Sequence, residues 1–296
     1  MRNLHKEITD RIVARLKSGV VPWRQPWSAK GFGVMPRNAV TARAYSGANV
    51  LLLWSRAQES GFSDPRWLTF KQALEAGGNV RKGEKGECVV YVSKVIRTDD
   101  DGEKRSIPFL KAYTVFNVAQ CDNLPAKITD PNAAARQCNS DARDALAEAF
   151  IHSSRATVRH GEARAYYSPA GDLVNLPPFE TFKSSSSYYA IAFHELGHWT
   201  GAEKRLNRTF GKRFGDRAYS AEELVAELTS AFLCAEFGFD NDGQDAAYIA
   251  YWITFLTEHD KAIVAAAAAA SRAVEFMRGL ALAEDDDAVE SFPIAA

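Results

Sequence analysis

Two histidines and a glutamate interrupt an otherwise apolar stretch, AIAFHELGHWTG, at residues 190–201. His194 and His198 are four residues apart, so on a helix they lie on one face, about one turn from each other. Two imidazoles in that arrangement can bind one tetrahedral divalent ion, and Glu195 projects beside them, where it can take a proton from a water on the ion. The alternative is a helix whose two histidines are satisfied by hydrogen bonds, because burying them without partners is costly. The H-E-x-x-H spacing favours the metal.

A metal site of this kind needs a third protein ligand and leaves its fourth position open for water. Downstream, YSAEELVAELTSAFLC (219–234) places Glu223 and Glu227 four residues apart on one face of a predicted helix. One of them can bind the ion, while the other can hydrogen-bond a ligand imidazole and fix its tautomer. We predict Glu223 as the ligand and Glu227 as the support, with the reverse order left open, and we expect Glu222 to face solvent. The alternative is that these acidic residues form a solvated helix start, where they suit the helix dipole.

The chemistry expected of such a site is metal-assisted hydrolysis, with Glu195 as the general base. Zn²⁺ is the expected ion, and a set of two histidines and a glutamate also accepts Mn²⁺, Co²⁺ or Ni²⁺. Tyr219 is either a group that stabilises an oxyanion or a packing residue at the helix start. The strand DLVNLPP (172–178), just before the histidine helix, is either an edge strand that pairs with an extended peptide or a buried strand of a hairpin.

The composition is that of a folded globular protein. The 296 residues are 46% hydrophobic and 25% charged, and the length is comfortable for two domains. The N-terminal MRNLHKEITDRIVARLKSG carries charges throughout, so a secretory signal is not expected, and the apolar run at 262–270 is too short to cross a bilayer. The cysteines are scattered without a C-x-x-C pair, which predicts reduced thiols in a cytoplasmic protein rather than a disulfide framework.

Hydrophobic periodicity predicts an α+β fold with two domains. In the first half we expect helices packed on a small antiparallel sheet, namely helices over 4–19, 48–59 and 69–76 and strands over 86–98 and 107–121. The polar, proline-containing segment 123–140 is predicted to link a domain at 1–122 to a mainly helical domain at 141–296.

The second half is predicted to hold a β-hairpin, a series of helices and an irregular tail. The hairpin joins 162–168 to 172–178 around Pro169–Gly171, and the loop Ser184–Ser187 can cap the helix that carries the two histidines. The helices are expected at 142–152, from 188 onward, at 220–237, at 244–265 and at 266–283. The acidic tail from 284 is expected to be frayed.

Charge divides the chain into a basic and an acidic half. Residues 1–125 carry 20 Lys and Arg against 12 Asp and Glu, whereas residues 126–296 carry 16 against 25. In the basic half, cations alternate with aromatic residues, as in Arg66–Trp67 and Phe70–Lys71, and RKGEKGE (81–87) adds a basic turn. This combination is typical of proteins that bind single-stranded nucleic acid, because cations track the phosphates and rings stack on the bases. The simpler interpretation is that most of these rings are core residues, above all Trp54.

Long segments of the chain resemble the ArdC-type plasmid antirestriction proteins. They are PWRQPW, RNAVTARAYSGANVLLLW, DPRWLTFKQALEAGGNVRKGEKGECVVY, HELGHWTG, RLNR, AYSAEELVAEL and YIAYWI. The similarity runs over about residues 5–283, and its N-terminal part also resembles the start of TraC-type conjugative primases.

The resemblance implies an N-terminal domain that binds single-stranded DNA and a C-terminal zincin-like metallopeptidase domain. It places the metal site on His194, His198 and a glutamate of EELVAE, with Glu195 as the catalytic carboxylate. It also implies protection of an incoming plasmid strand from host restriction during conjugation, in the cytoplasm, including that of a recipient cell. The matching N-terminal segments carry the candidate DNA contacts Arg37, Arg43, Tyr45, Lys71, Arg81, Lys82 and Lys85.

Three functions are compatible with these features. The first is an antirestriction factor that binds single-stranded DNA and holds a metal in its zincin-like domain. The second is an active metallopeptidase that uses DNA to find a protein substrate, such as a host restriction enzyme or another DNA-bound protein. The third is a DNA-binding accessory module without catalysis.

Overall fold

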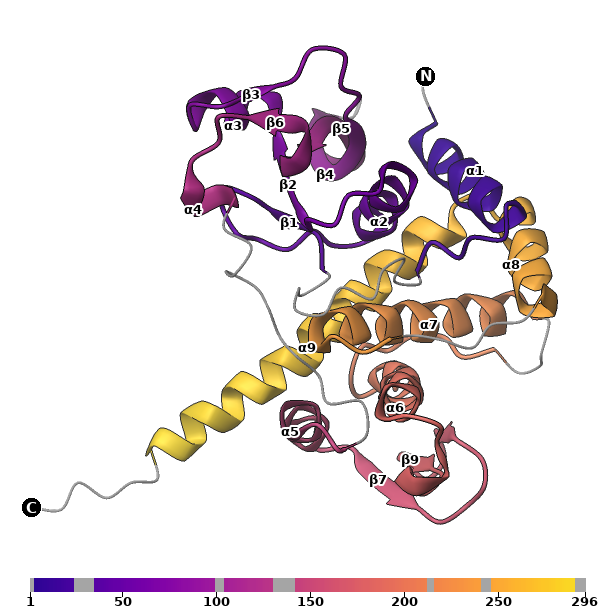
Figure 1. The fold of residues 1–296 in the computed structure, drawn as a ribbon. Coiled ribbons are helices and arrows are strands. Elements are labelled where there is room, and N and C mark those ends of the chain that lie inside the picture. The colour runs from indigo at the N-terminus through magenta and orange to yellow at the C-terminus, as the bar shows by residue number, and fades with distance from the viewer. Residues whose placement is uncertain are drawn as a thin grey trace, which may run out of the picture.

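The computed structural model of the chain describes residues 3–23, 35–98, 104–129, 142–211, 216–240 and 246–290. Its architecture is α+β, as the sequence predicts, with a sheet in each half of the chain (Figure 1). Two long crossing helices, α7 (Arg217–Phe237) and α9 (Ala262–Glu290), lie between the N-terminal sheet and the C-terminal sheet (Figure 1). Elements of both halves of the chain pack against these two helices.

The N-terminal sheet has four strands in the order β1-β2-β5-β4. Their bounds are β1 (Arg37–Asn38), β2 (Arg66–Thr69), β4 (Glu87–Thr98) and β5 (Lys104–Asn117). The predicted antiparallel pairing of two long strands is confirmed, because β4 and β5 pair from Glu87 opposite Val115 to Thr98 opposite Lys104. The sheet is mixed rather than purely antiparallel, since β1 joins β2 in parallel. A second, two-stranded sheet pairs β3 (Asn79–Val80) with β6 (Cys121–Asp122).

The helices of the first half begin and end where local sequence dictates. They are α1 (Leu4–Lys17), α2 (Ala48–Ser60), α3 (Phe70–Glu75) and α4 (Ala126–Thr129). Helix α2 ends at Gly61, whose φ of 67° is a left-handed conformation that glycine adopts without strain. The side chain of Asn49 on α2 bonds both the amide and the carbonyl of Val90, each at 2.7 Å, and so satisfies the outer edge of β4.

The segment predicted as a linker contains helix α4 at its start. Ile128 of α4 is buried in a cluster with Leu68, Ala73 and Val118 of the N-terminal half. Residues 130–140 of the predicted linker lie outside the described part of the chain. The division into domains at 1–122 and 141–296 therefore stays a prediction.

The C-terminal half contains α5 (Ala145–Ser153), the three strands β7 (Thr157–His160), β8 (Tyr166–Ser168) and β9 (Leu173–Leu176), and α6 (Ser185–Thr200). The predicted hairpin is confirmed, since Ser168 of β8 lies opposite Leu173 of β9. Of the two alternatives for the strand before the histidine helix, the buried strand of a hairpin is confirmed and the edge strand is wrong. β9 is the central strand, because β7, a short polar segment that periodicity does not reveal, pairs with it in parallel.

The last two helices divide at a different place from the predicted one. Helix α8 (Ala246–Glu258) ends before the turn 259–261, and α9 begins at Ala262, so the predicted boundary between 265 and 266 falls inside α9. Alanine has the highest helix propensity, so the run continues a helix and does not interrupt one. Helix α9 extends to Glu290, so residues 284–290 are helical and not frayed as expected. Residues 291–296 lie outside the described part of the chain. Among the described residues, no helix has both the length and the apolar character of a membrane span.

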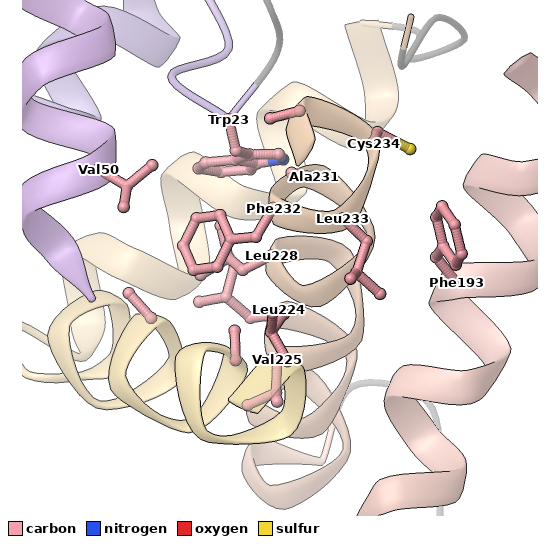
Figure 2. Packing of buried hydrophobic residues seen from close by; sticks show 14 of the residues in the cluster. Trp23, Val50, Phe193, Leu224, Val225, Leu228, Ala231, Phe232, Leu233 and Cys234 are labelled. Atoms are coloured by element: carbon pink, nitrogen blue, oxygen red, sulfur yellow. The ribbon is translucent and has the colours of Figure 1, made fainter. Parts of the chain in front are cut away.

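One continuous hydrophobic core joins the two halves of the chain. Figure 2 shows Trp23 and Val50 of the N-terminal half facing helix α7, with Phe193 of α6 beside the opposite side of that helix. Trp54 meets Phe232 of α7 edge-on at 6.0 Å between ring centroids, and it is buried as predicted. Helix α7 therefore contacts the N-terminal half through one face and the histidine helix through another.

Candidate metal centre

Close packing of α6 against α7 positions the histidines. Gly197 lies against α7 so closely that a Cβ at this position would come within 3.0 Å of the Cα of Ala226. Ser230 of α7 donates a hydrogen bond of 2.7 Å to the carbonyl of Ala190 on α6, and both groups are buried. The side chain of Ser184 accepts from the amide of Ser187 and caps α6, as predicted. The missing side chain at Gly197 thus lets α7 approach the histidine face.

The two histidines and Glu223 converge on one point. The imidazole rings of His194 and His198 have centroids 4.9 Å apart. Nε2 of His194 lies 3.5 Å from one carboxylate oxygen of Glu223, and Nε2 of His198 lies 3.5 Å from the other. One ligand atom from each of these three residues lies within 4.8 Å of the others, which is the spacing of donors around a single ion.

The other ring nitrogen of each histidine faces a second glutamate. Nδ1 of His194 lies 3.8 Å from Glu227, and Nδ1 of His198 lies 3.3 Å from Glu222. A histidine that donates from Nδ1 to a carboxylate keeps the lone pair of Nε2 free to bind an ion. The expectation that Glu222 faces solvent is wrong, because its side chain is only 5% exposed.

Arg208 explains why Glu222 is buried. Its guanidinium donates to both oxygens of Glu222, at 2.9 and 2.7 Å, and also to the carbonyl of Gly197 at 2.6 Å. Burial raises the pKa of Glu222, but the hydrogen bonds from Arg208 and His198 outweigh burial and lower it. Sequence reasoning missed this contact, because Arg208 lies 14 residues before Glu222 in a segment without regular structure.

The site carries more carboxylate than positive charge. Burial lowers the pKa of His194, yet the pKa rises to about 9, because three carboxylates surround the ring, those of Glu223, Glu227 and Glu195. Glu195 itself is 8% exposed, and its carboxylate is among the charges that raise the pKa of His194. A divalent cation between the three converging side chains would neutralise this excess negative charge, so both the donor types and the charge fit a metal ion.

A cavity of about 180 Å³ opens beside His198 and Glu223. Its lining includes His198, Glu223 and Tyr219. Tyr167 of the edge strand β8 and Pro169 of the hairpin turn also line it. Burial and the neighbouring carboxylate of Glu223 raise the pKa of Tyr219 to about 12, so its phenol stays protonated at neutral pH. The hairpin therefore reaches the site through the edge strand β8 and not through β9.

A second arginine of the same RLNR segment fixes the end of α6. Arg205 lies over the ring of Trp199, 4.0 Å from its centroid, and donates to the carbonyl of Trp199. It also donates to Asp172 and to the hydroxyl of Tyr167, and so ties α6 to the hairpin. The RLNR motif pointed to this segment, but the sequence alone did not show what its two arginines contact.

The candidate DNA contacts fall in three places. Arg37, Arg43 and Tyr45 lie on β1 and on the segment before α2, Lys71 lies on α3, and Arg81, Lys82 and Lys85 share the loop between β3 and β4. Lys71, Lys82 and Lys85 are exposed, although Lys71 pairs with Glu75 at 3.4 Å. Arg81 is held by Glu84 and Asp122, and Tyr45 is half-buried, which raises the pKa of its phenol. Within PWRQPW, residues 24–27 lie outside the described part.

Comparison with known proteins matches two family models to separate parts of the chain. Residues 2–116 match the family described as the N-terminal domain of anti-restriction factor ArdC, and residues 145–269 match a zincin-like metallopeptidase family. The chain is 38% identical over 294 residues to a DNA primase TraC of Escherichia coli. The match covers 92% of this chain and 27% of TraC, so the chain spans about a quarter of the length of that relative. It is 35% identical over 288 residues to the uncharacterized protein y4eC of Sinorhizobium fredii, covering 93% of this chain and 91% of that protein.

Two crystal structures of the antirestriction protein ArdC from plasmid R388 have the same fold. The metal-free structure is 40% identical, with a TM-score of 0.81, and the match covers 95% of this chain and 99% of that one. The Mn(II)-bound structure is 38% identical, with a TM-score of 0.79, and the match covers 95% and 98%. Because similarity at this level extends over nearly all of both chains, the protein belongs to the ArdC family of antirestriction proteins.

Proposed function

We propose that the protein is an antirestriction factor that binds single-stranded DNA through its N-terminal half and holds a divalent metal in its C-terminal half. The metal ligands in this proposal are His194, His198 and Glu223. One observation carries it: the Nε2 atoms of the two histidines each lie 3.5 Å from a different oxygen of Glu223. Zn²⁺ is the proposed ion, and Mn²⁺ is the first alternative, since a relative was solved with Mn(II).

The residues around the ligands have separate roles in this proposal. Glu227 and Glu222 are positioning residues, because each faces the Nδ1 atom of one histidine and so directs its Nε2 toward the ion. When bound, the ion would polarise a carbonyl and activate water. Glu195 would accept a proton at its carboxylate and return it to a leaving amine. Tyr219, protonated and beside Glu223, can donate a hydrogen bond to a developing oxyanion.

The proposed DNA interaction rests on charge and on the family. Residues 1–125 carry the excess of Lys and Arg, and Lys82 and Lys85 are exposed in one loop. Such cations attract the phosphates of a strand without reading its sequence. The protected molecule would be an incoming conjugative plasmid strand in the cytoplasm, with a host restriction enzyme or another DNA-bound protein as a further partner.

A second candidate function is proteolysis of a DNA-associated protein. It is favoured by the carboxylate of Glu195, whose charge acts on His194, and by the 180 Å³ cavity that His198 and Glu223 line. The substitution Glu195→Gln separates the two functions, because it removes the base but none of the three proposed ligands. If plasmid protection survives with DNA and metal binding unchanged, protection does not require proteolysis. If protection disappears while both kinds of binding persist, the protein acts as a peptidase.

The DNA-binding part is tested by charge reversal at Lys82 and Lys85. The double variant should bind an oligothymidine about tenfold more weakly at low salt. Its affinity should also depend less steeply on salt, by about 0.7 in the slope for each phosphate that the loop no longer neutralises. The matched control reverses two exposed cations of the C-terminal half, Arg159 and Lys183. Equal affinity in the test and control variants would remove this loop from the proposed interface.

A further inference from the structure

A second and larger cavity lies at the N-terminal ends of α7 and α9. It has a volume of about 640 Å³, within the range of about 300–1,000 Å³ that is usual for small-molecule sites. Part of its lining is made of small side chains, those of Ala221, Ala262, Ala265, Ala266 and Ala269. Four of these belong to the first turns of α9, so the alanine-rich segment of the sequence leaves this space open.

Charged side chains line the cavity, and cations are in slight excess over acids. Arg217, Lys261 and Arg272 line it and are exposed, and none of the three has an ion-pair partner within the described ranges. Two acidic residues, Glu258 and Asp260, also line it. Since Arg208 and Glu222 pair with each other, three cations remain against these two acids. The helices α7 and α9 begin here, although the side chain of Asp216 already caps α7 by accepting from the amide of Ala218. The cavity is therefore suited to an anionic group.

The cavity shares a wall with the candidate metal centre. Arg208 and Glu222 line it, and Glu222 also lines the 180 Å³ cavity beside His198. The hydrogen bonds between Arg208 and Glu222 thus separate the two cavities. A ligand in the larger cavity would contact the pair that holds Nδ1 of His198.

The cavity also adjoins the N-terminal half. The amide of Gly47 donates to the hydroxyl of Ser271, at 2.8 Å, directly before Arg272. Thr9 of α1 donates to the carbonyl of Asp260, at 2.6 Å. Arg43 and Tyr45, two of the candidate DNA contacts, precede Gly47 by only a few residues. A strand that follows these residues would come close to the rim of the cavity at Arg272.

We propose that this cavity binds a nucleotide, with the phosphate held by Arg217 and Arg272 and the base against the alanine side chains and Phe255. Arginine binds phosphate oxygens bidentately, and the alanine side chains leave an apolar space for a flat ring. The nucleotide would belong to the strand that the N-terminal half binds, and to this extent the inference rests on the proposed function. It assigns a role in DNA binding to the C-terminal half, where the net charge is negative.

The test compares full-length variants with an oligothymidine of about 20 nucleotides, a length that exceeds one binding site of this kind. Arg217→Ala combined with Arg272→Ala should weaken binding about tenfold and reduce the salt slope by about 0.7, because the phosphate that both cations hold is no longer neutralised. Ala265→Trp keeps every charge but fills the cavity, and it should weaken binding to a similar extent. The control Arg159→Ala removes an exposed cation of the same half and should leave affinity unchanged.

Thymidine 5′-monophosphate, tested alone, distinguishes a free nucleotide from a strand. Binding of the monophosphate that Ala265→Trp abolishes would identify a site for free nucleotides; weaker oligothymidine binding alone would identify a site for a strand. If the cavity variants bind both probes like the wild type, the inference is overturned. The proposed function survives that result as long as charge reversal at Lys82 and Lys85 weakens binding. It fails together with the inference only if the wild type binds no oligothymidine.

Discussion

At the scale of residues, Glu223 and Glu227 differ in the imidazole nitrogen that they face. Glu223 faces Nε2 of both histidines, whereas Glu227 faces Nδ1 of His194. We therefore predict that Glu223→Gln weakens zinc binding more than about 100-fold, while Glu227→Gln weakens it by only about 10–100-fold, the effect of an outer partner. Competition with a chelating dye measures both affinities. A larger effect in Glu227→Gln would reverse the order of ligand and support.

Asp172 provides a prediction that depends on pH. A hydrogen bond from Arg205, helped by Lys204 and Tyr167, holds the pKa of Asp172 well below its usual range. A lowered pKa in the folded state adds stability above the unfolded pKa of about 4, and this contribution falls as the pH drops below that value. Asp172→Asn should therefore cost about 1 kcal/mol of unfolding free energy at pH 7, discounted for partial exposure, and less at pH 3. Urea unfolding at both pH values measures this; a constant difference would contradict the assignment.

The residues of the site were predictable to different degrees. The placement of His194 and His198 on one helix face follows from their spacing, and Glu223 was a candidate partner, while the order of ligand and support stays a prediction. Glu222 was not predictable, because its burial depends on Arg208, which approaches from a separate segment. Spacing describes contacts within one helix, whereas a partner from another segment is fixed by tertiary packing.

At the scale of elements, Gly197 sets the distance between α6 and α7. In Gly197→Ala the added Cβ would lie 3.0 Å from the Cα of Ala226 and 3.2 Å from Thr229, so the helices must separate. We predict a decrease of about 1–3 kcal/mol in unfolding free energy and a weaker affinity for metal. The matched control is Gly279→Ala on α9, where a Cβ meets nothing within 4 Å. It should stabilise the protein by about 0.5–1 kcal/mol. Equal effects of both substitutions in thermal unfolding would contradict this account.

Elements with strong periodicity were predicted well, and short ones were not. Strands β4 and β5 and helices α2 and α7 lie close to their expected positions, and α2 and α7 each bury many apolar residues. β7 was missed, because its four residues, Thr157–His160, are mostly polar and are stabilised by pairing with β9. Without β7, the sequence could not show that β9 is a central strand.

At the scale of the whole molecule, the two halves share one core. The opposite charges of the halves suggest separate modules, yet Val50 of α2 is fully buried in the cluster that includes α7 and α9. We predict a single unfolding transition for the full chain. Val50→Ala should lower the unfolding free energy by about 1–2 kcal/mol and reduce amide protection in α7 as well as in α2. Two transitions, or reduced protection confined to α2, would show that the halves unfold independently.

The packing of one half on the other was beyond sequence reasoning. Trp23, an aromatic residue of the basic half, is buried against Trp252 of α8, with ring centroids 6.4 Å apart. Composition indicates that such a ring is suited to a core, but it does not say which distant helix completes that core. The charge asymmetry that suggested two modules reflects the surface residues of the two halves. It carries no information about the buried contact between them.

The most direct test of the central claim is the metal content of the full-length protein after incubation with excess Zn²⁺ and removal of unbound ion. The account predicts about one ion per chain for the wild type and almost none for His198→Ala, as expected when a tetrahedral site is deprived of one of three protein ligands. Wild-type protein that stays free of metal, or a His198→Ala variant that retains a full equivalent, would contradict the assignment of His194, His198 and Glu223 as a metal site.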